Sequence, residues 1–245
     1  MTSEINPNEI NPQHAPSART AAWTAKGAAW LIPAGLILLS VVPVVVGAAR
    51  LVELGSAAPV TPGNARFFAA PLPVVLHILS VTVYSILGAL QFAPSFRRRH
   101  ARWHRRAGWM LIPAGLMAAI SGLWMTLTYP WPSGDGVLLY WLRLVFGTAM
   151  TVSIFRGVIA LRRRNFAQHG AWMLRGYAIG LGAGTQVFTH LFWLLLAGQP
   201  TESARAVLMG AGWVINLAVA EWIIRRRAAG ARRSTRRLAV PVQPS

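Results

Sequence analysis

The sequence predicts an all-α, polytopic transmembrane helix bundle, and three observations predict it. The chain of 245 residues is 54% hydrophobic and only 12% charged, which leaves few polar side chains to cover a surface in water. Its apolar residues gather into runs of about 20, the length that crosses a hydrocarbon layer of roughly 30 Å as a helix. Its basic residues flank these runs. We predict six spans, at residues 27–49, 71–93, 107–128, 138–160, 171–197 and 206–224.

These spans form one membrane domain, residues 27–227, with residues 71–197 as its core. The N-terminal segment 1–26 is rich in Asn, Pro and Ser, and the basic tail 228–245 has no apolar period, so both are predicted to be disordered. Segment 1–26 also lacks a basic stretch directly before a short apolar one. The first span is therefore predicted to be an uncleaved anchor.

Positive charge in this chain is concentrated at the ends of the apolar runs. If the spans alternate in direction, all three arginine clusters fall on one side, and the positive-inside rule places both termini in the cytoplasm. The net charge of +18 would also suit nucleic acid. Clusters beside apolar spans instead favour a bilayer with anionic headgroups as the partner, and no nucleic acid. The clusters comprise Arg97, Arg98, Arg99, Arg102, Arg105 and Arg106, then Arg162 to Arg164, then the seven arginines from Arg225 to Arg237.

Several kinds of chemistry are excluded by residue type. The chain has no cysteine, which excludes disulfides, cysteine nucleophiles and cysteine-ligated zinc or iron–sulfur sites. Protease, hydrolase and P-loop motifs are absent. His100 and His104 form an H-x-x-x-H pair like those of di-iron membrane desaturases, but such sites need more than the six histidines present. The sequence thus favours a protein that is not an enzyme and has no metal site of this kind.

Span five carries a repeat of small residues. Gly176, Gly180 and Gly184 are spaced four apart, which leaves a groove on one helix face where a neighbouring backbone can approach closely. We predict a central position for span five in the bundle.

Four histidines fall at two predicted depths. His77 and His190 lie about a third of the way in from the outer surface, while His104 and His169 lie at the cytoplasmic surface. On a straight span five, the 21 positions from His169 to His190 correspond to about 31 Å. The outer pair and the inner pair are thus separate levels.

Further polar residues predict a polar interior. His77, Tyr84 and Gln91 recur every seven residues on span two and form one stripe. Arg143 lies on span four near the level of the outer histidines, where a charge needs a partner or water. Glu221 is the one carboxylate inside a predicted span, and we expect it to pair with Arg156, Arg175 or Arg225.

Three hypotheses follow for these residues. The histidines could hydrogen-bond between helices as structural contacts. Alternatively, His77 and His190 could be the axial ligands of a b-type haem in a redox protein, with His104 and His169 as a weaker pair. A third possibility is a small anion transporter that uses Arg143 and the His77 stripe.

Three stretches of the chain together resemble one family. They are His77 to Gly88 with Gln91 and Phe92; Arg98, His104, Arg105 and Gly108; and His169, Trp172, Met173, Arg175 and Tyr177. The resemblance is to the bacterial predicted membrane proteins grouped as domain of unknown function 2306, over about residues 75–195. Trp109, Met110 and Gly176 depart from the pattern. The resemblance implies a bacterial inner (plasma) membrane location, and a shared site or packing core for His77, His104, His169 and Arg175.

Overall fold

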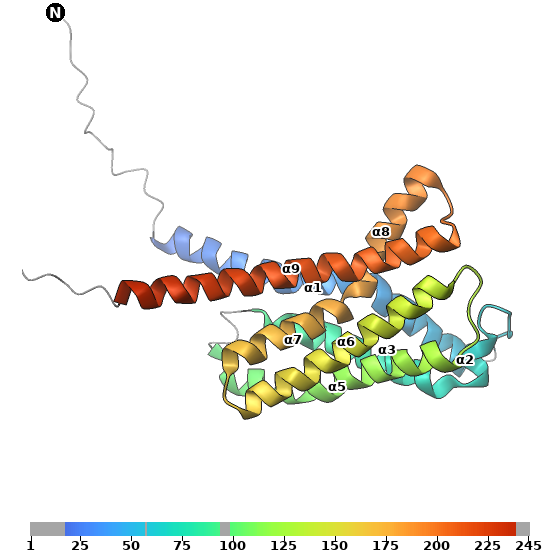
Figure 1. Ribbon diagram of the computed structural model, residues 1–245, viewed down its shortest axis with the longest axis horizontal. Helices are drawn as coiled ribbons and strands as arrows, with labels where there is room; N and C mark the ends of the chain where they lie inside the picture. Colours follow the sequence, from blue (N-terminus) through green and yellow to red (C-terminus); the bar gives the residue numbers. More distant parts are fainter. Residues whose placement is uncertain (1–17, 57, 94–98, 239–245) are drawn as a thin grey trace, which may run out of the picture.

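The computed structural model is helical in the parts of the chain that it describes, residues 18–56, 58–93 and 99–238. No strand occurs among these residues. The predicted all-α class is thereby confirmed. The helices are α1 (Ala18–Gly55), α2 (Ala65–Ala69), α3 (Pro71–Gln91), α5 (Ala101–Thr128), α6 (Val137–Arg162), α7 (Phe166–Gly180), α8 (Gly182–Ala197) and α9 (Glu202–Leu238) (Figure 1).

The helices supply the membrane spans that the apolar runs predict. Five of them, α1, α3, α5, α6 and α9, are each long and apolar enough to cross a membrane. Helices α7 and α8 meet the same criterion only as a pair, which brings the number of spans to as many as six. The pair is bent by 42°.

This bend corrects the prediction of a straight fifth span. It lies at Leu181, between Gly180 and Gly182, and glycine is a poor helix former that often accompanies kinks. Around it, the Gly184 amide donates to the Leu181 carbonyl oxygen at 3.0 Å, a bond of the tighter 3₁₀ type. His169 and His190 therefore lie on different helices, α7 and α8, and the separation of about 31 Å along one straight helix is wrong.

Local sequence explains where several helices begin. Pro71 is the first residue of α3, a position where its missing N–H leaves no hydrogen bond unmade. The Asn165 side chain accepts a hydrogen bond from the Gln168 amide at 3.0 Å and caps α7. Thr201 accepts one from the Ala204 amide in the same way at the start of α9.

The two terminal segments predicted to be disordered are partly helical. Helix α1 begins at Ala18 and α9 continues to Leu238, so residues 18–26 and 228–238 extend the first and last spans. Residues 18–26 are rich in Ala, and residues 228–238 are rich in Ala and Arg, which are good helix formers. Residues 1–17 and 239–245 lie outside the described part of the chain.

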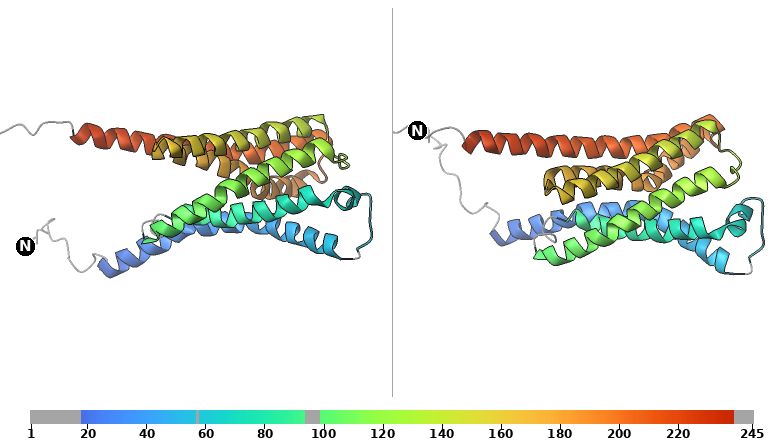
Figure 2. Two further views of the ribbon diagram at one scale, coloured as in Figure 1. Left: turned by 90° about the horizontal axis from the view of Figure 1, so that it is seen from below. Right: turned by 60° about the horizontal axis from the view of Figure 1, so that its bottom comes forward.

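The spans form two groups that converge at one end of the molecule and diverge at the other (Figure 2). Helices α1, α3 and α5 make one group, and α6, α7 and α9 make the other. Helix α7 packs against α3, α5, α6 and α9, which confirms the predicted central place for the first half of span five, while α8, its second half, turns away to pack on α1 and α9. We call the end that carries Arg162–Arg164 the basic end, and the end that carries residues 129–136 the loop end.

Tyr84 of α3 occupies the centre of the core and is only 3% exposed. Its ring fits between glycines of two other helices. A Cβ atom added at Gly115 of α5 would lie 2.6 Å from Tyr84 Cε2, and one at Gly180 of α7 would lie 3.0 Å from Tyr84 Cε1. Gly180 thus makes room for a side chain, whereas Gly184 meets a backbone as predicted, because its added Cβ would lie 2.2 Å from the Leu39 carbonyl oxygen of α1.

Candidate functional site: a cationic cavity at the loop end

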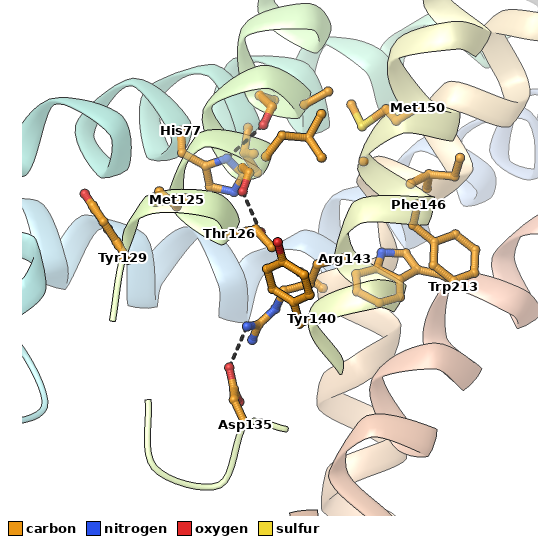
Figure 3. A pocket seen from close by; sticks show the side chains of 18 of the residues that line it. His77, Met125, Thr126, Tyr129, Asp135, Tyr140, Arg143, Phe146, Met150 and Trp213 are labelled. Carbon is orange, nitrogen blue, oxygen red and sulfur yellow. Dashed lines mark hydrogen bonds and ion pairs between the residues drawn. The ribbon is translucent and has the colours of Figure 1, made fainter. Parts of the chain in front are cut away.

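A cavity of about 360 Å³ opens between α3, α5 and α6 at the loop end (Figure 3). This volume falls in the range of small-molecule sites. Its wall combines a few polar groups with a mostly apolar, aromatic surface. The polar lining residues include Arg66, His77, Thr126, Asp135, Arg143 and Gln186, and the apolar ones include Phe146, Met150 and Trp213.

The cavity reaches well into the helix bundle. His77 and Tyr84 both line it and stand seven residues apart on α3, which is about 10 Å along the helix axis. Arg143 and Met150 have the same spacing on α6. The charged groups therefore lie toward the mouth, and the ring of Tyr84 forms the inner floor.

One carboxylate organises the charge at the mouth. Asp135 accepts from Arg143 Nη1 at 2.5 Å and from Arg205 Nε at 2.9 Å, and its side chain is only 3% exposed. Beside it, the Glu202 carboxylate packs against Gly136. Since Asp135 lies between two guanidinium groups, it fixes the 129–136 loop to both α6 and α9.

Arg66 adds a further positive charge to this wall. Among the described residues it forms no ion pair, and its guanidinium stacks on the Phe67 ring, 4.6 Å from the centroid. Burial lowers the pKa of Arg66, and the nearby Arg143 and Arg50 lower it further while Asp135 raises it. An arginine remains protonated at neutral pH despite such a shift. The cavity wall therefore carries two arginines and one aspartate.

His77 presents a hydrogen-bond acceptor to the cavity. Its Nδ1 lies 2.9 Å from the Ala118 carbonyl oxygen of α5 and 3.2 Å from Ser121 Oγ. A carbonyl oxygen can only accept, so in the neutral ring Nδ1 carries the proton and Nε2 is the acceptor. Ser121 in turn donates to the Met117 carbonyl oxygen at 2.5 Å.

The structure does not bring His77 and His190 into one site. His77 lines the cavity, whereas His190 lies on α8, with Nδ1 2.8 Å from the Gln186 carbonyl oxygen of its own helix, and is not among the cavity-lining residues. Helix α3 packs mainly on α1, α5 and α7, while α8 packs on α1 and α9. The two histidines thus lie on separate helices and only His77 lines the cavity, and a haem held between their imidazoles stays a prediction.

His104 and His169 belong to the basic end. His169 Nδ1 lies 2.9 Å from the Gly157 carbonyl oxygen of α6, a contact between helices. His104 lies on the first turn of α5, 14 residues before the Ala118 that His77 contacts, which is about 21 Å along that helix. The histidines implied by the family resemblance thus occupy two regions rather than one shared site.

Arg175 and Glu221 form a second polar cluster, toward the basic end. Arg175 Nε and Nη2 donate to the two Glu221 oxygens at 2.5 and 3.0 Å, which confirms the expected pairing of Glu221. Trp172 lies between two arginines, with its ring centroid 4.6 Å from the Arg175 guanidinium and 5.1 Å from that of Arg156. This cluster ties α7 to α9.

We expect Glu221→Gln to destabilise the protein by about 1–2 kcal/mol, because the bidentate ion pair between two spans is lost. Thermal unfolding in detergent measures the effect, and a double-mutant cycle with Arg175→Gln isolates the pair. Glu53→Gln is the matched control, since among the described residues the Glu53 carboxylate pairs with Arg50 of its own helix and with Asn64 at the start of α2, and so links no two spans. If Glu221→Gln and Glu53→Gln lost equal stability, the Arg175–Glu221 pair between α7 and α9 would contribute no more than a pair near the end of a span.

Two other predicted interior residues keep buried polar atoms without a partner. Tyr84 Oη and Gln91 Nε2 are buried and have no hydrogen bond among the described residues. Both lie on the predicted α3 stripe, beyond His77 toward the basic end. Such groups are uncommon in folded proteins.

Sequence reasoning missed several residues of the cavity. Asp135 and Arg66 stood out only as loop charges, although they form its mouth. Gln186 could have been found as a polar residue inside an apolar run; it is 7% exposed and donates to the Met209 carbonyl oxygen at 3.0 Å. Trp213 carries no such signal, because tryptophan is common in membrane helices.

The cavity can bind a ligand through charge, hydrogen bonds and apolar contact. No cluster of three His, Asp or Glu side chains that could hold a metal ion occurs in the part of the chain that the structure describes.

Fold and cavity together define a polytopic α-helical membrane protein with an internal polar site. The chain belongs to the family described as predicted membrane protein (DUF2306), whose model matches residues 74–224. The match runs from α3 into α9 and so includes both the cavity and the Arg175–Glu221 pair. No curated protein and no solved structure matches the chain.

Proposed function

We propose that this protein binds a small anion in the loop-end cavity and carries it across the membrane. The observation that carries the proposal is Arg143, an arginine on an apolar span that lines a cavity penetrating the bundle. A charge inside a span is unfavourable and is typical of substrate and ion pathways.

The ion pairs at the mouth support an exchange of partners. Arg143 donates to Asp135 at 2.5 Å, and Arg205 holds the same carboxylate from α9. An incoming anion offers Arg143 a second acceptor, and Asp135 can then remain with Arg205. Binding would thus loosen the link between the loop and α6 without leaving the aspartate unpaired.

We expect Arg143→Ala to abolish uptake of the substrate anion into proteoliposomes, because the cavity loses its charge inside the bundle. The measurement is saturable, protein-dependent uptake from a panel of chloride, phosphate, acetate and benzoate. Arg156→Ala is the matched control, an exposed arginine on the same helix near the basic end. Uptake that survives Arg143→Ala, or that no anion of the panel shows, would contradict the proposal.

We also propose a bacterial inner-membrane location with the basic end in the cytoplasm. The start of α1, the end of α9 and the Arg162–Arg164 turn all lie toward that end, which matches the positive-inside rule (Figure 2). Anionic headgroups are then the partner of the arginine clusters. Protease protection of tags fused to each terminus, in cells and in inverted vesicles, tests the orientation, and cleavage of either tag from outside intact cells would contradict it.

A further inference from the structure

We infer that the ligand of the loop-end cavity is an amphipathic monocarboxylate: one carboxylate at the mouth and an apolar body, with a hydrogen-bond donor, directed inward. This inference rests on the proposed anion site and names the class of molecule that the site selects.

Charge at the mouth favours a single negative charge. The cavity wall holds Arg66 and Arg143 against Asp135, an excess of one positive charge. At the rim, Arg205 and Glu202 offset each other. A monoanion would neutralise the site, whereas a dianion would leave an uncompensated negative charge in a partly buried place.

The inner half of the cavity favours an apolar body. Farther from the mouth than Arg143, the wall includes Phe146, Met150 and Trp213, and the Phe146 and Trp213 rings are stacked with centroids 4.8 Å apart (Figure 3). A volume of about 360 Å³ also exceeds what a single inorganic ion fills. An apolar group such as an aromatic ring, extending inward from the carboxylate, would cover part of this surface.

His77 favours a ligand whose apolar body carries a hydrogen-bond donor. Its Nδ1 is engaged by the Ala118 carbonyl, so the acceptor Nε2 remains for the ligand. Thr126 lines the same wall, but its hydroxyl already donates to the Gly122 carbonyl oxygen at 2.8 Å. A hydroxyl or N–H on the ligand would satisfy the imidazole, which a plain hydrocarbon leaves unpaired.

Calorimetric binding to the full-length protein in detergent tests this selection with four probes. Benzoate is the amphipathic monocarboxylate, acetate lacks the body, benzamide lacks the charge, and 4-hydroxybenzoate adds a donor. We expect benzoate to bind at least about tenfold more tightly than acetate or benzamide, and 4-hydroxybenzoate more tightly still. Arg66→Gln should remove most of the preference for benzoate over benzamide, and His77→Ala should remove the gain from the hydroxyl.

The possible outcomes distinguish a wrong ligand class from the absence of the proposed anion site. Acetate that binds as tightly as benzoate, with both losing affinity in Arg66→Gln and Arg143→Gln, overturns the amphipathic class but leaves the anion site. If no carboxylate binding depends on either arginine, the anion site itself is overturned. Arg156→Gln should change none of the affinities. Because Arg143→Gln also breaks a contact to the loop, Arg66→Gln, whose arginine forms no ion pair among the described residues, gives the decisive comparison.

Discussion

Replacing Gly184 with alanine is expected to lower the stability of the protein by about 3 kcal/mol, a large loss for one methyl group. A Cβ at this position would lie 2.2 Å from the Leu39 carbonyl oxygen of α1 and 2.8 Å from Leu39 Cγ. A backbone atom cannot move aside as a flexible side chain can. Helix α8 would have to separate from α1, one of the two main helices on which it packs.

Thermal unfolding in detergent, followed by circular dichroism, should show a fall in Tm of about 6–12 °C for this loss in a chain of this size. Gly35→Ala on α1 is the control, because a Cβ there would meet no heavy atom within 4 Å and alanine favours the helix. If Gly184→Ala unfolded at the same temperature as Gly35→Ala, the close approach of α8 to α1 would be absent in the protein.

Sequence patterns predicted the features that depend on composition and helical periodicity. The length of apolar runs indicated the spans, and the lone carboxylate Glu221 needed one of very few nearby cations, so its pairing with Arg175 could be anticipated. The glycine repeat indicated close packing of span five, and α7 is the helix at the centre of the bundle. In each case a local rule limits the possible partners to a short list.

Other features depend on contacts between distant segments, which no local rule defines. Asp135 is one acidic residue in a loop, and nothing in its surroundings shows that it lies between Arg143 and Arg205, the latter 70 residues away in the chain. The histidines were compared by depth alone, but depth does not say which helices adjoin. His77 and His190 share a predicted level, yet only His77 lines the cavity. The bend at Leu181 further separates the positions that a straight helix would align.

The ring of Tyr84 closes the inner side of the cavity. Because of this position, replacing Tyr84 has the largest predicted effect on access from the loop end to the residues beyond the cavity. Its ring is held in place by Gly115 and Gly180, and a Cβ at Gly176 would lie 3.4 Å from its hydroxyl oxygen and 3.6 Å from Ser153 Cβ. The hydroxyl therefore lies past the floor, near Ser153. Beyond it along the same stripe comes Gln91, whose buried Nε2 also lacks a partner among the described residues. Tyr84 thus separates the cavity from a second set of polar groups nearer the basic end.

We expect Tyr84→Ala to join these two regions and make Ser153 accessible from the loop end. The chain contains no cysteine, so single cysteines can be introduced without a background. Thr126→Cys, on the cavity wall, should react with a negatively charged methanethiosulfonate added at the loop end, while Ser153→Cys should not. With Tyr84→Ala also present, Ser153→Cys should react readily, because loss of the ring leaves an open passage.

Tyr84→Phe distinguishes the ring from the hydroxyl in the same assay. It keeps the barrier and removes only an unpartnered polar atom, so Ser153→Cys should stay unreactive beside it. Tyr84→Ala also removes a buried aromatic side chain, at a cost of about 3–5 kcal/mol in stability, and unfolding alone could expose Ser153. A cysteine at Leu139, which is fully buried, controls for this, since Leu139→Cys should remain unreactive in a folded Tyr84→Ala protein. If Ser153→Cys reacted equally fast with Tyr84 intact, the ring would not be the barrier, and the cavity would already be continuous with the region beyond it.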